Sequence, residues 1–280
     1  MSRVRAFAHD DLRFDVADEG PEDGDVVVLL HGFPQRYTSW RDVVPRLHAA
    51  GYRTLAPDLR GYSPGARPKG RRAYSLDKQV GDVKALVDAV GGPVHVVGHD
   101  WGGAYAWSFA GAHPELTRTL TAISTPHPRA FQAALRTKEQ ARKSWYMGVF
   151  QVPLLPELVA GSAPRRFDGL LRASGMTRED VERFRTEVVA YGALPGALGI
   201  YRAMPMMLTS SGSGMGRTVR VPTTYVWSTG DVALGRPAAE ASAQYVDAPY
   251  EFVVLEGPSH WLPEHAPEAV ADAILARVGG

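Results

Sequence analysis

The sequence predicts an α/β protein with a mostly parallel, doubly wound sheet and one inserted helical segment. Between residues 26 and 124, short apolar runs alternate with segments of helical periodicity, and the turns between them have the lengths typical of βαβ units. The alternation stops after residue 129 and resumes beyond residue 216. We therefore predict a core formed by residues 1–129 and 217–280, with residues 130–216 forming a helical cap.

The elements before the insertion follow from apolar periodicity. Leu12, Phe14 and Val16 alternate with polar neighbours, which predicts a hairpin from residues 3–8 and 11–18. Continuous apolar runs such as Val26–Leu30 suit strands that are covered on both faces. We expect strands at 26–30, 53–57, 93–97 and 119–124, and helices at 39–50, at 75–90 with Ser75 as N-cap, and from 101 onward.

The inserted segment is helical by composition, and the sheet resumes after it. No strand-like run occurs between residues 130 and 209, where prolines interrupt a chain rich in Met and aromatic residues. Beyond it, the periodicity predicts strands at 223–227 and 251–255 and helices at 237–245 and 267–278.

Composition limits the functional classes. A chain of 280 residues, 45% hydrophobic, can bury one large core with a lid, and a net charge of +1 predicts no nucleic-acid partner. The absence of cysteine excludes disulfides and thiolate metal sites. No signal-peptide core and no run of about 20 apolar residues is present. We expect a cytoplasmic protein, monomeric or homodimeric, with no membrane partner.

The segment Gly98-His99-Asp100-Trp101-Gly102 has the pattern of a nucleophile elbow between a strand and a helix. Its exposed residue is an aspartate, whose carboxylate is ionised at neutral pH because its pKa is about 4. Attack on a carbonyl would give a high-energy anhydride, whereas attack on a strained or halogenated carbon gives an ordinary ester. Asp100 therefore favours epoxide or carbon–halogen cleavage. The alternative is that Asp100 only caps the helix.

Two later loops carry residues in the order expected of an acid and a histidine after an elbow nucleophile. Asp231 follows the strand at 223–227, and His260 follows the strand at 251–255. Glu256 is the rival acid, but its closeness to the histidine loop in sequence disfavours it. Taken singly, Asp231 could be a turn residue and His260 a loop residue.

The segment His31-Gly32-Phe33-Pro34 follows the first parallel strand. In the elbow layout, a backbone N–H from this loop and one from the residue after the nucleophile form an oxyanion hole. These donors would belong to Phe33 and Trp101. A simple turn containing glycine and proline is the alternative.

These motifs, with Gly230-Asp231 and Ser259-His260-Trp261, resemble the α/β-hydrolase epoxide hydrolases over nearly the whole chain. The resemblance implies a cofactor-free reaction in which Asp100 is the nucleophile, His260 the general base and Asp231 its orienting acid. It also implies two cap tyrosines that hydrogen-bond the epoxide oxygen. Tyr146 and Tyr201 stand in matching contexts, with Tyr191 as a substitute for Tyr201.

The expected substrate is a small apolar epoxide, which water converts to a vicinal diol. We expect His31, Pro34, Trp145, Phe150 and Met204 to line its pocket. No metal site is expected, because Pro263 interrupts the group formed by His260, Glu264 and His265 and the spacing fits no zinc motif.

Two alternatives remain at this point. A haloalkane or haloacid dehalogenase would use the same aspartate, with Trp101 as a halide ligand, although Phe33 stands where many such enzymes carry a polar residue. A non-catalytic ligand-binding protein on a hydrolase scaffold would not need the full set of catalytic positions.

Overall fold

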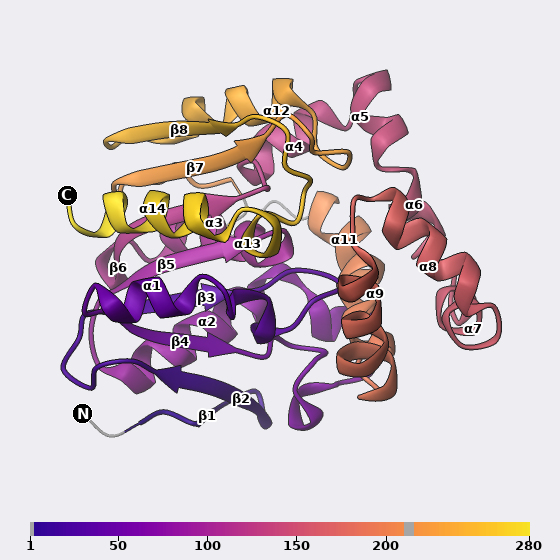
Figure 1. Ribbon diagram of the computed structural model, residues 1–280, viewed down its shortest axis with the longest axis horizontal. Helices are drawn as coiled ribbons and strands as arrows, with labels where there is room; N and C mark the ends of the chain where they lie inside the picture. Colours follow the sequence, from indigo (N-terminus) through magenta and orange to yellow (C-terminus); the bar gives the residue numbers. More distant parts are fainter. Residues whose placement is uncertain (1–2, 210–215) are drawn as a thin grey trace.

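Eight strands form one sheet in the order β1-β2-β4-β3-β5-β6-β7-β8 (Figure 1). The computed structural model describes residues 3–209 and 216–280. The hairpin of β1 and β2 is antiparallel, β2 pairs antiparallel with β4, and the remaining pairs are parallel, as predicted. The strands are β1 Ala6–His9, β2 Leu12–Glu19, β3 Val26–Leu30, β4 Arg53–Pro57, β5 Val94–His99, β6 Thr117–Ile123, β7 Thr223–Ser228 and β8 Tyr250–Leu255.

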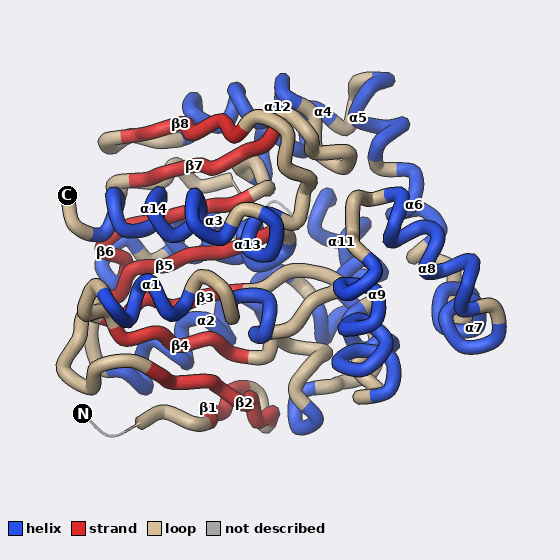
Figure 2. The backbone as a smooth tube through the Cα atoms, in the orientation of Figure 1, coloured by secondary structure: helices blue, strands red, loops and turns tan. Residues whose placement is uncertain are grey.

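Helices cover both faces of the sheet (Figure 2). In the core they are α1 Val44–Ala49, α2 Leu76–Val90, α3 Trp101–Ala112, α12 Arg236–Ala241, α13 Leu262–His265 and α14 Pro267–Val278. Short 3-10 helices occupy Tyr37–Trp40, Pro64–Ala66, Arg71–Tyr74, Pro114–Leu116 and Ser242–Tyr245. Together, α12 and the 3-10 helix after it cover the helix expected over 237–245.

Two apolar layers pack on opposite faces of the sheet. On β3, Val28 and Leu30 join the layer beneath α2 and α3, whereas Val27 and Leu29 join the layer beneath α1 and α14. Side chains alternate across a strand, so a strand that is covered on both faces must be apolar at every position. This double burial explains the continuous apolar runs in the sequence.

The helical segment between β6 and β7 lies at the carboxyl ends of the strands (Figure 1). It comprises α4 Pro128–Ala134, α5 Lys138–Lys143, α6 Trp145–Val149, α7 Leu155–Ser162, α8 Pro164–Ala173, α9 Arg178–Phe184, a π-helical stretch Arg185–Ala190, α10 Leu194–Ala197 and α11 Gly199–Thr209. No strand occurs within 130–209, as predicted. The boundaries of the cap at 130 and 216 stay predictions, and its residues 210–215 lie outside the described part.

One local prediction was wrong. The helix expected over 39–50 begins only at Val44, because Pro45 has no N–H to donate to Arg41 and disfavours a helix that continues through it. Ser75 is the N-cap of α2, as predicted, although its side chain makes no capping hydrogen bond. Within residues 3–209 and 216–280, no helix combines the length and the apolarity needed to cross a bilayer.

Close backbone contacts fix the end of β5 against β3 and α3. A Cβ on Gly102 would lie 2.2 Å from the carbonyl oxygen of Leu30, and a Cβ on Gly98 would lie 2.2 Å from that of Gly102. Both glycines are required by these contacts, which hold the turn between β5 and α3 against the end of β3.

We predict that Gly102→Ala destabilises the protein by about 1–3 kcal/mol, because α3 must move away from β3 to admit the methyl group. Gly169→Ala is the matched control. It lies within α8, its added Cβ meets nothing within 4 Å, and alanine should stabilise that helix by about 0.5–1 kcal/mol. Denaturant unfolding measures both changes, and a Gly102→Ala variant as stable as the natural chain would contradict this packing.

Candidate active site

Asp100 lies on the turn between β5 and α3 with φ of 51° and ψ of −121°. This backbone conformation is rare for a residue with a side chain and costs about 1–3 kcal/mol. Although Asp100 occupies the N-cap position of α3, its carboxylate makes no capping hydrogen bond. The alternative that Asp100 serves as a helix cap is therefore wrong.

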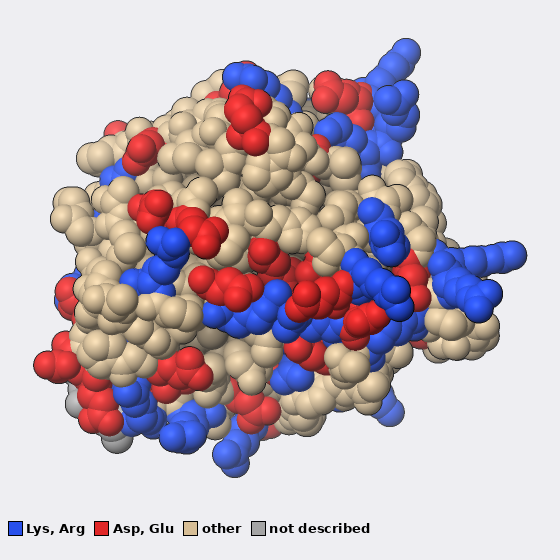
Figure 3. All heavy atoms as spheres, in the orientation of Figure 1, with Lys and Arg blue, Asp and Glu red and all other residues tan. Residues whose placement is uncertain are grey.

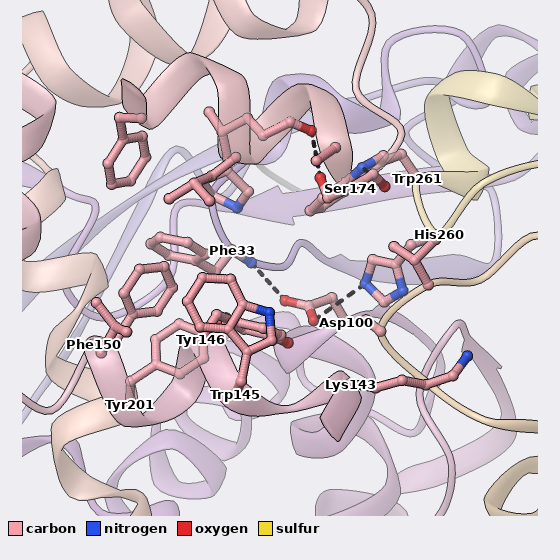
Figure 4. Close-up of a pocket in the computed structure, with 18 of the residues that line it drawn as sticks. Phe33, Asp100, Lys143, Trp145, Tyr146, Phe150, Ser174, Tyr201, His260 and Trp261 are labelled. Carbon is pink, nitrogen blue, oxygen red and sulfur yellow. Dashed lines mark hydrogen bonds and ion pairs between the residues drawn. The ribbon is translucent and has the colours of Figure 1, made fainter. Parts of the chain in front are cut away.

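The Asp100 carboxylate is held between the β3 loop and the histidine (Figure 4). The backbone N–H of Phe33 donates to Oδ1 at 2.8 Å, and Oδ2 lies 3.4 Å from Nε2 of His260. A Cβ on Gly32 would lie 2.6 Å from Oδ1, so the loop approaches this closely only with glycine there. Trp101 begins α3 directly after Asp100, and the role of its N–H stays a prediction.

Asp231 and His260 form a buried pair. Nδ1 of His260 lies 2.8 Å from Oδ2 of Asp231, while Oδ1 of Asp231 accepts from the N–H groups of Ala233 at 2.8 Å and Leu234 at 2.9 Å. The rival acid, Glu256, is exposed and instead accepts from the Thr229 hydroxyl. The structure therefore brings Asp100, His260 and Asp231 together in one chain of contacts.

Two side chains donate hydrogen bonds to the backbone of His260. The His260 carbonyl accepts from Nε2 of His99 at 2.9 Å and from the Ser124 hydroxyl at 2.8 Å. Burial, and then the charge of His260, lower the pKa of His99 to about 4, so this ring stays neutral. The side chain of His127 does not contact His260. It caps α4, where it accepts a hydrogen bond from the backbone N–H of Arg129.

The charges of this group are strongly coupled. Burial disfavours the imidazolium of His260, but the charge of Asp231 and hydrogen bonds to both carboxylates raise its pKa to about 10. Burial likewise disfavours the carboxylate of Asp100, yet the hydrogen bond and charge of His260 hold its pKa below the usual value. Both carboxylates thus favour the imidazolium form of His260.

Tyr146 and Tyr201 lie on the side of Asp100 opposite His260 (Figure 4). Their ring centroids are 6.2 Å apart, and Tyr201 packs against Phe33 at 5.1 Å and Phe150 at 4.9 Å. Burial raises the pKa of both phenols well above the usual value, and the Asp100 charge adds to this shift. Both hydroxyls therefore remain protonated.

Two cavities meet at Asp100, Tyr146 and His260. The larger, of about 330 Å³, is lined by Pro34, Trp145, Phe150 and Tyr201 among others, and the smaller, of about 80 Å³, by Trp101 and Met204. The predicted pocket residue His31 lies outside both cavities. Its buried ring accepts from the N–H of Leu59 and contacts the carbonyl of Gly32, so it supports the loop from beneath.

The substitute tyrosine is also outside the site. Tyr191 lines neither cavity, and its ring lies under the guanidinium groups of Arg36 at 3.7 Å and Arg67 at 4.8 Å. Among the described residues, no three His, Asp or Glu side chains are grouped so that they could hold a metal ion.

Sequence reasoning missed residues that reach the site from the inserted helices. Lys143, at the end of α5, donates to the backbone carbonyl of Asp231 at 3.0 Å, and Phe167 and Leu171 of α8 line the larger cavity. In the sequence, a lysine of a short polar helix that contacts the site has the same neighbours as a lysine that faces solvent. No sequence signal therefore identifies Lys143.

Comparison with known proteins fits this geometry. Residues 27–273 match the model of the alpha/beta hydrolase family, and the chain belongs to this family. It is 35% identical over 269 residues to the AB hydrolase superfamily protein YfhM of Bacillus subtilis, covering 93% of this chain and 92% of the relative. It is 31% identical to epoxide hydrolase 3 of Xenopus tropicalis, covering 92% of this chain and 72% of the relative.

Solved structures of epoxide hydrolases are similar to this chain over nearly its whole length. An epoxide hydrolase from metagenomes of hot environments superposes with a TM-score of 0.83 and 30% identity, covering 100% of both chains. Epoxide hydrolase A from Mycobacterium thermoresistibile gives a TM-score of 0.83 and 25% identity, over 99% of this chain and 98% of that one. The resemblance to the epoxide hydrolases of the alpha/beta hydrolase family is confirmed.

We predict that Asp100→Asn lowers the pKa of His260, because it removes one of the two carboxylate charges that favour the imidazolium. In the natural chain His260 should remain protonated across neutral pH. The Asn variant should lose this proton at lower pH, by at least about one pH unit. Titration of the imidazole by nitrogen NMR measures the shift, and identical titration curves would contradict the coupling.

Proposed function

We propose that this chain hydrolyses apolar epoxides to vicinal diols through an ester formed on Asp100. The observation that carries the proposal is the position of the ionised Asp100 carboxylate, which lies between its hydrogen-bonding partners and two tyrosine hydroxyls. On one side are the Phe33 N–H and the His260–Asp231 pair, and on the other are two protonated phenols. The epoxide and water are the only reactants, and no cofactor is required.

The first step is nucleophilic attack. An oxygen of Asp100 forms a bond to one epoxide carbon while the bond from that carbon to the epoxide oxygen breaks. The developing alkoxide takes a proton from Tyr146 or Tyr201, whose phenols are protonated in the resting site and lie beside Asp100. The product is a hydroxyalkyl ester on Asp100 and a phenolate.

Ester formation changes the charge next to His260. Esterified Asp100 is neutral, so one of the causes that raise the pKa of His260 disappears. The imidazolium can then return its proton toward the phenolate through the hydroxyl groups and water of the site. A neutral imidazole remains, still oriented by Asp231, and it can act as a base.

The second step is hydrolysis. His260 takes a proton from water, and the hydroxide attacks the carbonyl carbon of the ester. The Phe33 N–H already contacts Oδ1 of Asp100, and with the Trp101 N–H it stabilises the negative charge that develops there. Collapse of this intermediate breaks the bond from the Asp100 carbonyl carbon to the substrate oxygen. That oxygen leaves as an alkoxide and takes the proton of the added hydroxyl, so the diol is released, the carboxylate is restored and His260 is again protonated. A cytoplasmic location and a monomeric or homodimeric state accompany the proposal as expectations.

We predict that His260→Gln forms the ester and then stalls, because histidine is needed only for hydrolysis. After incubation with an aryl epoxide, intact-mass spectrometry should show the protein heavier by one substrate. Asp100→Ala is the control and should show no adduct. An unmodified His260→Gln protein, with its fold intact by circular dichroism, would contradict the assigned roles.

A second prediction separates the two reactions that an aspartate nucleophile supports. The natural chain should give diol from an aryl epoxide and no free halide from a haloalkane or haloacetate. Tyr146→Phe with Tyr201→Phe should slow diol formation by about 10²-fold or more, because both proton donors are removed. Halide release without diol would favour the dehalogenase and assign both tyrosines to packing.

A further inference from the structure

The exposed apolar side chains of the described residues gather at one end of the molecule. Seven large apolar side chains are between 43% and 67% exposed. Three of them, Trp145, Leu170 and Val232, line the larger cavity. The other four lie on α7 and in the loop before it and are Val152, Leu154, Leu155 and Leu158. Contiguous apolar exposure of this kind marks an interaction surface.

The loop before α7 presents a continuous apolar run to solvent. Residues 152–155 read Val-Pro-Leu-Leu and are all exposed, while Pro156 and Ala160 are the buried residues of α7. Leu154 has a φ of 64°, in the left-handed region that a side chain such as leucine rarely adopts. We call Val152, Leu154, Leu155 and Leu158 the apolar tip.

Positive charge exceeds negative charge in the segment that contains the apolar tip. Residues 136–178 contain eight Lys or Arg and three Asp or Glu, although the whole chain has a net charge of only +1. Two of these acids pair with arginines from outside the segment, Glu157 with Arg202 at 2.9 Å and Asp168 with Arg185 at 2.6 Å. Figure 3 shows Lys and Arg projecting at this edge, beside surface that carries no charged side chains.

Four arginines of this segment can meet an anionic partner. Within the part of the chain that the structure describes, Arg142, Arg165, Arg166 and Arg172 form no ion pair. Arg142 and Lys143 line the larger cavity beside Trp145, so the same charge borders its mouth. Leucines and a tryptophan among basic residues are the combination that binds anionic lipid surfaces.

We propose that α6 to α8 dock on the surface of an anionic phospholipid bilayer, with the apolar tip inserted among the lipids. Such peripheral binding needs no spanning helix. A symmetric contact with a second copy is disfavoured, because it would bring the cations of both copies together. Sequence alone predicts no membrane partner, since only the fold shows which leucines remain exposed.

The position of the cavity gives this docking a consequence for substrate entry. Trp145, Leu170 and Val232 are exposed and also line the cavity that contains Asp100. A lipid-dissolved apolar epoxide could pass from the bilayer to the nucleophile along this lining without crossing bulk water. This consequence rests on the proposed function, whereas the docking itself does not.

Vesicle co-sedimentation of the full chain tests the docking independently of catalysis. The protein should sediment with equimolar phosphatidylcholine and phosphatidylglycerol vesicles and less with phosphatidylcholine alone. Leu154→Asn with Leu158→Ser should weaken binding by about tenfold or more, because the apolar tip no longer inserts. Asparagine tolerates the left-handed backbone at 154, so this variant should still fold.

A pair of arginine variants supplies the charge control. Arg165→Gln with Arg166→Gln should also weaken binding by about tenfold, whereas Arg71→Gln with Arg72→Gln should not, although both pairs are adjacent and exposed. Turnover of a water-soluble epoxide should be unchanged in all three variants. An absence of sedimentation, or binding insensitive to Leu154 and Leu158, would overturn the proposal. So would a dimer in size-exclusion chromatography that the leucine variant abolishes.

Discussion

The site depends on the backbone turn that places Asp100 at the end of β5. Its φ of 51° directs the carboxylate away from the N–H groups of α3 and toward the β3 loop, where the Phe33 N–H meets it. The turn is possible only because Gly98 and Gly102 allow β3, β5 and α3 to approach. The carboxylate therefore faces the cavity and contacts the Phe33 N–H and the His260 ring rather than the N–H groups of its own helix.

The balance of charge between His260 and two buried carboxylates is the second constraint on the site. Two buried carboxylates would repel each other if His260 did not lie between them, and the imidazolium would be unstable in this buried place without them. In the mechanism that we propose, an ester on Asp100 removes one negative charge, and this change converts His260 from a stabilising cation into a base. The same three side chains would then serve both halves of the proposed reaction without a rearrangement of the fold.

The sequence allowed the sheet, the insertion and the contacts among Asp100, His260 and Asp231 to be predicted, because each depends on local signals. Apolar runs mark doubly covered strands, and glycines mark the elbow. His31 was misplaced because a residue beside a site motif can point into the core as easily as into the cavity. Lys143 and the exposed leucines of α7 have no local signal, since their contacts depend on how the inserted helices pack over the sheet.

In the proposed mechanism Asp100, and not water, forms the first bond to the epoxide. A single-turnover reaction in heavy-oxygen water, with enzyme in excess over an aryl epoxide, distinguishes these two nucleophiles. We expect the diol from this turnover to contain only ordinary oxygen and the label to appear in the Asp100 carboxylate, located by peptide mass spectrometry. Labelled diol in the first turnover, with an unlabelled Asp100, would show direct attack by water and contradict attack by Asp100.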